Sequence, residues 1–143
     1  MARRARVIVV GCSTFGAAVA RSLSAAGCDV IVVDMREDAF DLLGDDFDGE
    51  TVTGDGSSAL LLRECGAERA THLVAATGRD TVNLLVAELA SEVLGVRQVL
   101  PVVDDDSLGE ILEQMGVDPI CPHRLCEEEL FRVTGLPRAE EER

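Results

Sequence analysis

Short apolar runs alternate with longer amphipathic stretches along the whole chain. Six short runs predict β-strands, at 6–10, 29–33, 50–53, 71–76, 98–103 and 118–121, and four of them are rich in valine, leucine or isoleucine. The stretches between them predict helices, at 15–26, 36–46, 57–65, 79–94 and 105–115, with a last helix that begins at Pro122. This alternation predicts an α/β fold: a doubly wound, Rossmann-like parallel sheet of about six strands with helices on both faces.

The turn after the first predicted strand has the spacing of a dinucleotide-binding loop. Gly11 and Gly16 flank Cys12-Ser13-Thr14-Phe15, and Asp34 ends the second strand. In such folds the amides at the helix start bind phosphate, and the acid accepts hydrogen bonds from a ribose. Ser13 stands where the pattern has its middle glycine, and its hydroxyl could donate to a phosphate oxygen. The alternative is a tight turn that only packs a helix against a strand.

Asp34 favours NAD(H) or an adenine nucleotide over NADP, because a carboxylate repels a 2′-phosphate. Arg36 lies two residues further on and would offset part of this repulsion, which leaves NADP open. A second alternative for Asp34 is that it only caps the next helix.

Two more polar loops follow the third and fourth predicted strands. The first is Gly54-Asp55-Gly56-Ser57-Ser58, in which Ser57 is expected to cap the following helix. The second runs from Thr77 to Asn83 and includes Asp80, which is expected either to cap the long helix or to line a site. Because the carboxyl ends of parallel strands meet at one edge of a sheet, these loops are expected to lie beside the glycine turn.

Charge and cysteine content narrow the class of protein. The formal net charge is -14, and all 13 basic residues are arginine. A nucleic-acid partner is not expected, because a polyanion would be repelled. The acidity also fits a salt-rich cytosol, in which carboxylate repulsion is screened. Five cysteines without framework spacing favour a reduced, cytoplasmic protein, and no apolar run reaches the ~18 residues of a membrane span.

Taken together, these loops make the sequence similar to the N-terminal RCK domain, also called the KTN or TrkA-like domain, of potassium channel and transporter regulators. The resemblance covers roughly residues 5–132. It rests on Gly11, Gly16, Asp34, the Gly54-Asp55-Gly56-Ser57 loop, Leu60, the run Ala67…Ala70…Leu73-Val74-Ala75, Thr77, Asp80, Asn83 and Pro122 after residues 116–120.

The resemblance implies a non-enzymatic regulatory domain, cytoplasmic and peripheral to the inner face of the membrane, that binds NAD(H) or alternatively ATP, ADP or AMP. It would control K⁺ transport through a membrane channel or transporter subunit, without inserting into the membrane itself. It also implies a homo-oligomer, as a dimer or ring. Short apolar residues recur on helices 79–94 and 105–115, which are the expected contacts, unless these residues only pack on the sheet. Residues 1–136 would form the domain and 137–143 a charged tail. The implied cofactor-binding residues are Gly11, Ser13, Thr14, Phe15, Gly16, Asp34, Met35, Gly54, Asp55, Gly56, Thr77, Asp80 and Asn83.

The chain departs from the family at the phosphate site and leaves alternatives open. Ser13 and Thr14 stand where members commonly have Gly and Arg, which removes a cation from the phosphates.

A small NAD-dependent oxidoreductase is one alternative function, although almost no chain remains for a substrate site. A thiol-based redox sensor is another, because the helix dipole can lower the pKa of Cys12. Cys121, His123 and Cys126 offer three metal ligands, in a spacing unlike common zinc sites.

Overall fold

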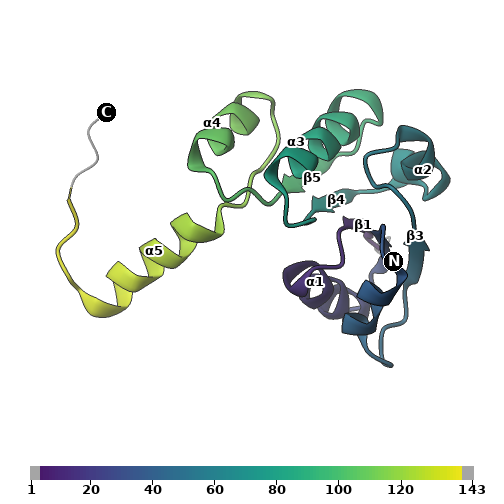
Figure 1. Cartoon of the computed structure of the whole chain (residues 1–143), viewed down its shortest axis with the longest axis horizontal. Coiled ribbons are helices and arrows are strands. Elements are labelled where there is room, and N and C mark those ends of the chain that lie inside the picture. Colours follow the sequence, from purple (N-terminus) through teal and green to yellow (C-terminus); the bar gives the residue numbers. More distant parts are fainter. Residues whose placement is uncertain (1–3, 140–143) are drawn as a thin grey trace.

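In the computed structural model, which describes residues 4–139, five parallel strands form one sheet (Figure 1). The strands are β1 Arg6–Val10, β2 Asp29–Asp34, β3 Glu50–Thr53, β4 His72–Ala75 and β5 Gln98–Pro101. Their order is β3-β2-β1-β4-β5. The chain builds the sheet outward from β1 to β3, then crosses back to place β4 on the other side of β1, so the topological switch point lies between β1 and β4. This is the strand order of doubly wound dinucleotide-binding folds. The predicted fold class is confirmed.

Helices cover both faces of the sheet because the central strands are apolar on both sides. Val7 and Val9 of β1 belong to a core that includes Ala17 and Ala20 of α1 (Thr14–Ala25). Ile8, the alternate residue, belongs to a second core, shared with α2 (Ala59–Glu64) and α3 (Asp80–Glu88). Continuous apolar strands of this kind are typical of parallel sheets buried on both faces.

The sixth predicted strand, 118–121, is reduced to one parallel bridge between Ile120 and Val102. The Ile120 amide donates to the carbonyl of Pro101 at 2.8 Å, so the segment does run beside β5. The Asp118 amide likewise donates to the carbonyl of Val99 at 3.0 Å. Pro122 begins a helix two residues after the bridge, and this ends the pairing with β5.

Three predicted helices differ from the structure in type or length. The helix predicted at 36–46 is a shorter 3₁₀ helix, Glu37–Leu43. Asp45 and Asp46 follow its end, and negative charge at a helix C-terminus disfavours a longer helix. The helix predicted from residue 57 begins at Ala59, because Ser58 is the cap. The long helix 79–94 is α3 followed by a π-helical turn, Leu89–Val93.

The last two helices are α4 (Asp106–Gln114) and α5 (Pro122–Thr134). α4 packs on the sheet through Leu112, whereas α5 extends away from the sheet and none of its residues is buried (Figure 1). No helix within residues 4–139 combines the length and the apolar character needed to cross a bilayer. Of the predicted tail, residues 137–139 are exposed, and 140–143 lie outside the described part of the chain.

Candidate functional site

Two glycines allow the first turn to pack against its neighbours. Gly11 has φ +104°, and a Cβ on it would stand 2.5 Å from the carbonyl oxygen of Ala76, which follows β4. A Cβ on Gly16, in the first turn of α1, would overlap the carbonyl oxygen of Gly11. A side chain at either position would push the turn away from β4 or α1. The turn thus brings the start of α1 against the carboxyl ends of β1 and β4.

Ser13 caps α1 instead of offering its proton to a ligand. Its Oγ accepts a hydrogen bond from the amide of Gly16 at 3.1 Å and donates to the carbonyl of Ala76 at 2.8 Å. The sequence-based expectation that this hydroxyl donates to a phosphate is therefore not what the structure has. Ala76 was not among the predicted residues, since no side-chain pattern marks a backbone carbonyl that accepts a bond.

The first turn of α1 leaves two amides without a partner. Within residues 4–139, the backbone N–H groups of Thr14 and Phe15 make no hydrogen bond. Both residues are exposed, and unpaired amides at a helix N-terminus, together with the helix dipole, attract anions. These amides are available to a phosphate group, although position 14 has a threonine and no basic side chain.

Asp34 ends β2 directly beside this turn. One carboxylate oxygen, Oδ2, accepts the amide of Cys12 at 2.8 Å, and the other, Oδ1, accepts the amide of Arg36 at 2.9 Å. The 3₁₀ helix that follows is capped by Arg36 without a side-chain bond, so Asp34 does not act as a helix cap. Because a carboxylate oxygen has two lone pairs, each can accept one further bond. Asp34 is half-buried and thus open to a ligand hydroxyl.

Arg36 is already paired. Its Nε and Nη2 donate to the two carboxylate oxygens of Asp38, at 3.2 and 2.8 Å, and this neighbour raises the pKa of Arg36 and lowers that of Asp38. A guanidinium held in this fork has its charge largely compensated. The suggestion that Arg36 would accommodate a 2′-phosphate is therefore not favoured.

The loop after β3 approaches the turn through backbone contacts. The amide of Gly54 donates to the carbonyl of Asp34 at 2.9 Å, and a Cβ on Gly56 would overlap the side chain of Val10. Asp55 accepts bonds from the amide and hydroxyl of Ser57, at 2.9 and 2.6 Å, which lower its pKa. Ser57, the residue predicted to cap the following helix, is bound to Asp55, and the observed cap of α2 is Ser58.

Asn83 lies beneath the third loop and is the one buried polar side chain among residues 4–139, with 2% exposure. Its Oδ1 accepts the amide and the hydroxyl of Thr77, at 2.9 and 2.6 Å, and its Nδ2 donates to the carbonyl of Val102 at 2.7 Å. Asn83 therefore ties the ends of β4 and β5 to α3. It shapes the loop that carries Thr77, and Thr77 itself is half-buried.

Replacing Asn83 with alanine is expected to lower the free energy of unfolding by about 2 kcal/mol, because three partly buried polar groups lose their partner. Urea unfolding at equilibrium measures the change. Thr81→Ala, at an exposed position of the same helix, is the control and should change stability by less than about 0.5 kcal/mol. Equal effects of the two substitutions would contradict the assigned role of Asn83.

Asp80 is the first residue of α3 and does not cap it, because Arg79 is the cap residue and makes no side-chain bond. Its two carboxylate oxygens accept the amides of Asp104 and Asp105, at 2.9 and 3.0 Å. The expectation that Asp80 is a helix cap is wrong. Asp80 connects the start of α3 to the loop after β5 instead.

Two apolar side chains stand exposed near the turn. Met35 follows Asp34 and has 72% of its surface exposed, and Phe15 has 44%. Both were predicted to contact a cofactor. Exposed large apolar side chains next to free amides and a carboxylate offer a surface that a planar aromatic ring can cover.

Cys12 does not have the exposure or the pKa direction expected of a redox-sensing thiol. Cys12 is buried, its Sγ donates to the carbonyl of Ala39 at 3.2 Å, and burial, followed by the charge of Asp34, raises its pKa. This direction is opposite to the lowered pKa that the redox-sensor alternative requires of Cys12. In the described part of the chain, no three His, Cys, Asp or Glu side chains are placed to hold a metal ion, and the segment from Cys121 to Cys126 does not form such a group.

Residues 7–122 match the family model of the TrkA-N domain. The chain is 31% identical over 126 residues to a Trk system potassium uptake protein TrkA from Streptomyces coelicolor, an alignment that covers 88% of this chain and 56% of the relative. It is 31% identical over 139 residues to a TrkA homolog from Archaeoglobus fulgidus, covering 94% of this chain and 31% of that protein. The chain thus spans about half, or less, of the length of these relatives.

Solved structures share the fold. The NAD(P)-binding domain of an exopolyphosphatase-related protein from Archaeoglobus fulgidus superposes with a TM-score of 0.76 at 21% identity, covering 93% of this chain and all of that one. The Kef C-terminal domain of Shewanella denitrificans in its AMP-bound form gives 0.71 at 24% identity, covering 90% and 82%. The GsuK channel bound to NAD gives 0.70 at 18% identity, covering 82% and 21%.

Proposed function

The chain belongs to the TrkA-N domain family, and we propose that it is a regulatory, non-enzymatic domain that binds a nucleotide and thereby controls K⁺ transport through a membrane channel or transporter subunit. The preferred ligand is NAD(H), with ATP, ADP or AMP as the alternative. Relatives described as potassium uptake proteins support the transport role. Fold neighbours solved with NAD and AMP support the choice of ligand.

One observation carries the proposal: the free amides of Thr14 and Phe15 lie in the same turn whose Cys12 amide is bonded to Asp34. A phosphate bound to the two amides places the adjoining ribose toward the Asp34 carboxylate, which has lone pairs left to accept its hydroxyls. The base then lies toward the exposed side chain of Met35. Phosphate, sugar and base each meet a group suited to them.

The same geometry favours NAD(H) over NADP(H). Asp34 repels a 2′-phosphate, and Arg36, the nearest basic side chain in the sequence, is held by Asp38 at 2.8 Å. No arginine stands at Thr14 to add charge at the phosphates. A diphosphate bound by backbone amides is therefore a better match than a triphosphate, which would carry more uncompensated charge.

Calorimetric titration with NAD, NADH, ATP, ADP and AMP tests the proposal. We expect saturable binding of one nucleotide per chain, strongest for NAD or NADH, and unchanged NADH absorbance during long incubation with candidate substrates. Absence of binding for all five would overturn the nucleotide role. Steady NADH consumption with a substrate would overturn the non-enzymatic assignment.

Two hydrogen-bonded links provide a route from the site to the rest of the domain. Asn83 connects the Thr77 loop to Val102, and Asp80 connects α3 to the loop that precedes α4. A nucleotide that draws the three loops together would thus move α3 and α4 with them. Regulation requires that the nucleotide binds two arrangements with different affinity.

We also propose that the domain, residues 1–136, works as a homo-oligomer at the cytoplasmic face of the membrane. α5 supplies the strongest support, since it has 13 residues and none is buried. Its Leu125, Leu130 and Val133 are 55%, 52% and 67% exposed, and they line one open apolar surface of the helix. A short helix with an uncovered apolar stripe needs a packing partner to be stable, and a second copy of the chain provides one.

Leu130→Asp is expected to weaken self-association at least tenfold, because it places an unpaired charge in an apolar contact. Size-exclusion chromatography with light scattering, over a range of concentrations, measures the shift toward monomer. Leu136→Asp introduces the same charge at a leucine of similar exposure (59%) beyond the end of α5. A monomeric wild-type protein, or equal effects of both variants, would contradict the assignment of α5 as the contact.

A further inference from the structure

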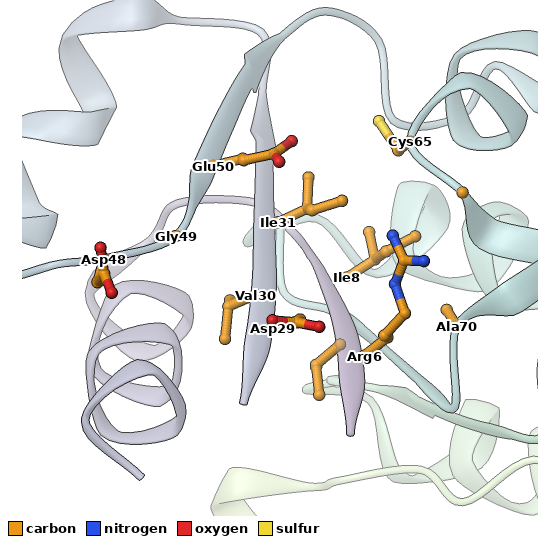
Figure 2. A pocket seen from close by; sticks show the side chains of 12 residues that line it. Arg6, Ile8, Asp29, Val30, Ile31, Asp48, Gly49, Glu50, Cys65 and Ala70 are labelled. Atoms are coloured by element: carbon orange, nitrogen blue, oxygen red, sulfur yellow. The ribbon is translucent and has the colours of Figure 1, made fainter. Parts of the chain in front are cut away.

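A hollow of about 380 Å³ lies at the amino-terminal edge of the sheet, opposite the glycine turn (Figure 2). Its floor is apolar and is formed by residues of β1 and β2, including Ile8 and Ile31. The buried residues Cys65, Gly66 and Ala70 form one wall, and Glu50 at the start of β3 stands on the opposite side. The hollow exists because α2 has only six residues and leaves this end of the sheet face uncovered.

Two guanidinium groups approach Gly66, which lines this hollow: Arg6 is itself a lining residue, and Arg69 lies beside the hollow at Gly66. A Cβ on Gly66 would stand 3.3 Å from Nη2 of Arg6 and 3.4 Å from Nη2 of Arg69, so both cations approach the same point above this glycine. Gly66 is buried with φ +83°, a conformation that leaves the space to the arginines. Figure 2 shows Arg6 reaching from β1 toward the segment that carries Cys65.

Neither guanidinium has a partner within residues 4–139, where no ion pair or side-chain hydrogen bond joins Arg6 or Arg69 to another group. Several other arginines are paired, among them Arg4 with Asp29, Arg63 with Glu68 and Arg132 with Glu129. In a protein with net charge -14, two neighbouring cations without a partner, one of them half-buried, favour an anionic ligand.

The other side of the hollow is acidic. In the sheet register Arg6 pairs with Asp29, and Ile31 pairs with Glu50, so these side chains lie on one face of neighbouring strands. Asp29 is bound to Arg4 at 3.7 Å, whereas Glu50 makes no ion pair in the described part of the chain. A ligand whose anionic end meets the arginines therefore needs a hydrogen-bond donor, preferably a cation, at its other end.

We propose that this hollow is a second ligand site, which binds a small zwitterion of amino-acid type. Its carboxylate or phosphate contacts Arg6 and Arg69, its ammonium group contacts Glu50, and its carbon chain lies on Ile8 and Ile31. The volume falls in the range of small-molecule pockets. The site is separate from the glycine turn, since the two lie at opposite ends of the same strands.

Amide chemical-shift titration of the isotope-labelled full chain tests the proposal, with L-glutamate, O-phospho-L-serine and glutarate as probes. We expect at least one zwitterion to shift amides at 65–70 and 29–31 while leaving those of 12–16 unchanged. Glutarate, which lacks the ammonium group, should bind at least tenfold more weakly than glutamate. A shift confined to 12–16, or no shift with any probe, would overturn the second site, and titration with NADH tests the nucleotide site separately.

Two substitutions separate the contributions of the walls. Arg6→Gln should weaken zwitterion binding about tenfold or more, because a charged hydrogen-bond donor is lost. Arg97→Gln, at an exposed position just before β5, removes the same charge outside the hollow and should have no effect. Glu50→Gln should weaken glutamate but not glutarate. Equal effects of Arg6→Gln and Arg97→Gln would show nonspecific charge attraction and overturn the proposal, as would glutarate binding as well as glutamate.

Discussion

Replacing Gly11 with alanine is expected to lower the free energy of unfolding by about 3 kcal/mol or more. Two costs add. The φ of +104° is unfavourable for any residue with a Cβ, and the new methyl group would stand 2.5 Å from the carbonyl oxygen of Ala76. That oxygen is backbone, held between β4 and β1, and cannot move aside cheaply. The same displacement would open the turn that carries the free amides, so nucleotide binding should fall with stability.

Gly27→Ala is the matched control. Gly27 also has a positive φ, +88°, but a Cβ there would meet nothing within 4 Å. The Gly27→Ala variant should therefore lose only the part of the free energy of unfolding that comes from the unfavourable φ, about 1–2 kcal/mol. Urea unfolding followed by circular dichroism gives both values, and the difference between them isolates the contact with Ala76. Similar losses for the two variants would mean that the turn does not pack against β4 as described.

Asp34→Ala is expected to weaken the binding of NAD(H) about 100-fold, since a carboxylate that accepts ribose hydroxyls contributes a charged hydrogen bond of about 1.5–3 kcal/mol. The substitution also removes the acceptor for the Cys12 amide, bonded at 2.8 Å. The turn that binds the phosphates is loosened as well. Both losses act on the same ligand, and calorimetric titration measures their sum.

Asp34→Asn separates these two losses. The amide oxygen of asparagine can still accept the Cys12 N–H, while the negative charge is gone. We expect NAD(H) to bind about tenfold more weakly and NADP(H) to bind relatively better, because the repulsion of its 2′-phosphate is removed. Asp38→Asn is a useful companion, because it frees Arg36 from its fork. Unchanged affinity in both Asp34 variants would remove Asp34 from the site.

The central strands of this fold can be predicted from the sequence because nearly all of their residues are buried apolar side chains. β1 pairs with β2 and β4 on either side and is apolar on both faces, so Val7 to Val10 can only be a buried parallel strand. The glycine turn is also predictable, since Gly11 and Gly16 are required by backbone contacts that are common to the fold.

The polar side chains are less predictable because their partners are backbone groups far along the chain. Asp80 accepts amides 24 and 25 residues away, and Asp34 accepts one 22 residues away. Nothing in the local sequence distinguishes such an acid from a helix cap. Ser57 and Ser58 are a similar case: both can cap a helix, and only the bond from Ser57 to Asp55 assigns the cap to Ser58.

Exposed surfaces that arise because no neighbouring element covers them cannot be predicted from the sequence. α5 was expected as a helix, but its lack of buried residues depends on the direction it takes after Cys121. The hollow beside Arg6 depends on the shortness of α2, which has six residues where a longer helix was predicted. In both cases the composition is ordinary, and the geometry alone makes the surface available.

The central claim is that a nucleotide binds at the carboxyl edge of the sheet, between the amides of the first turn and Asp34. Amide chemical-shift titration with NADH measures this directly, because it reports the position of the ligand as well as its affinity. The account predicts saturable shifts at 12–16, 34–36 and 54–56, all lost together in Asp34→Ala. Saturable shifts at 29–31 and 65–70 instead, or no shift at 12–16, would contradict it.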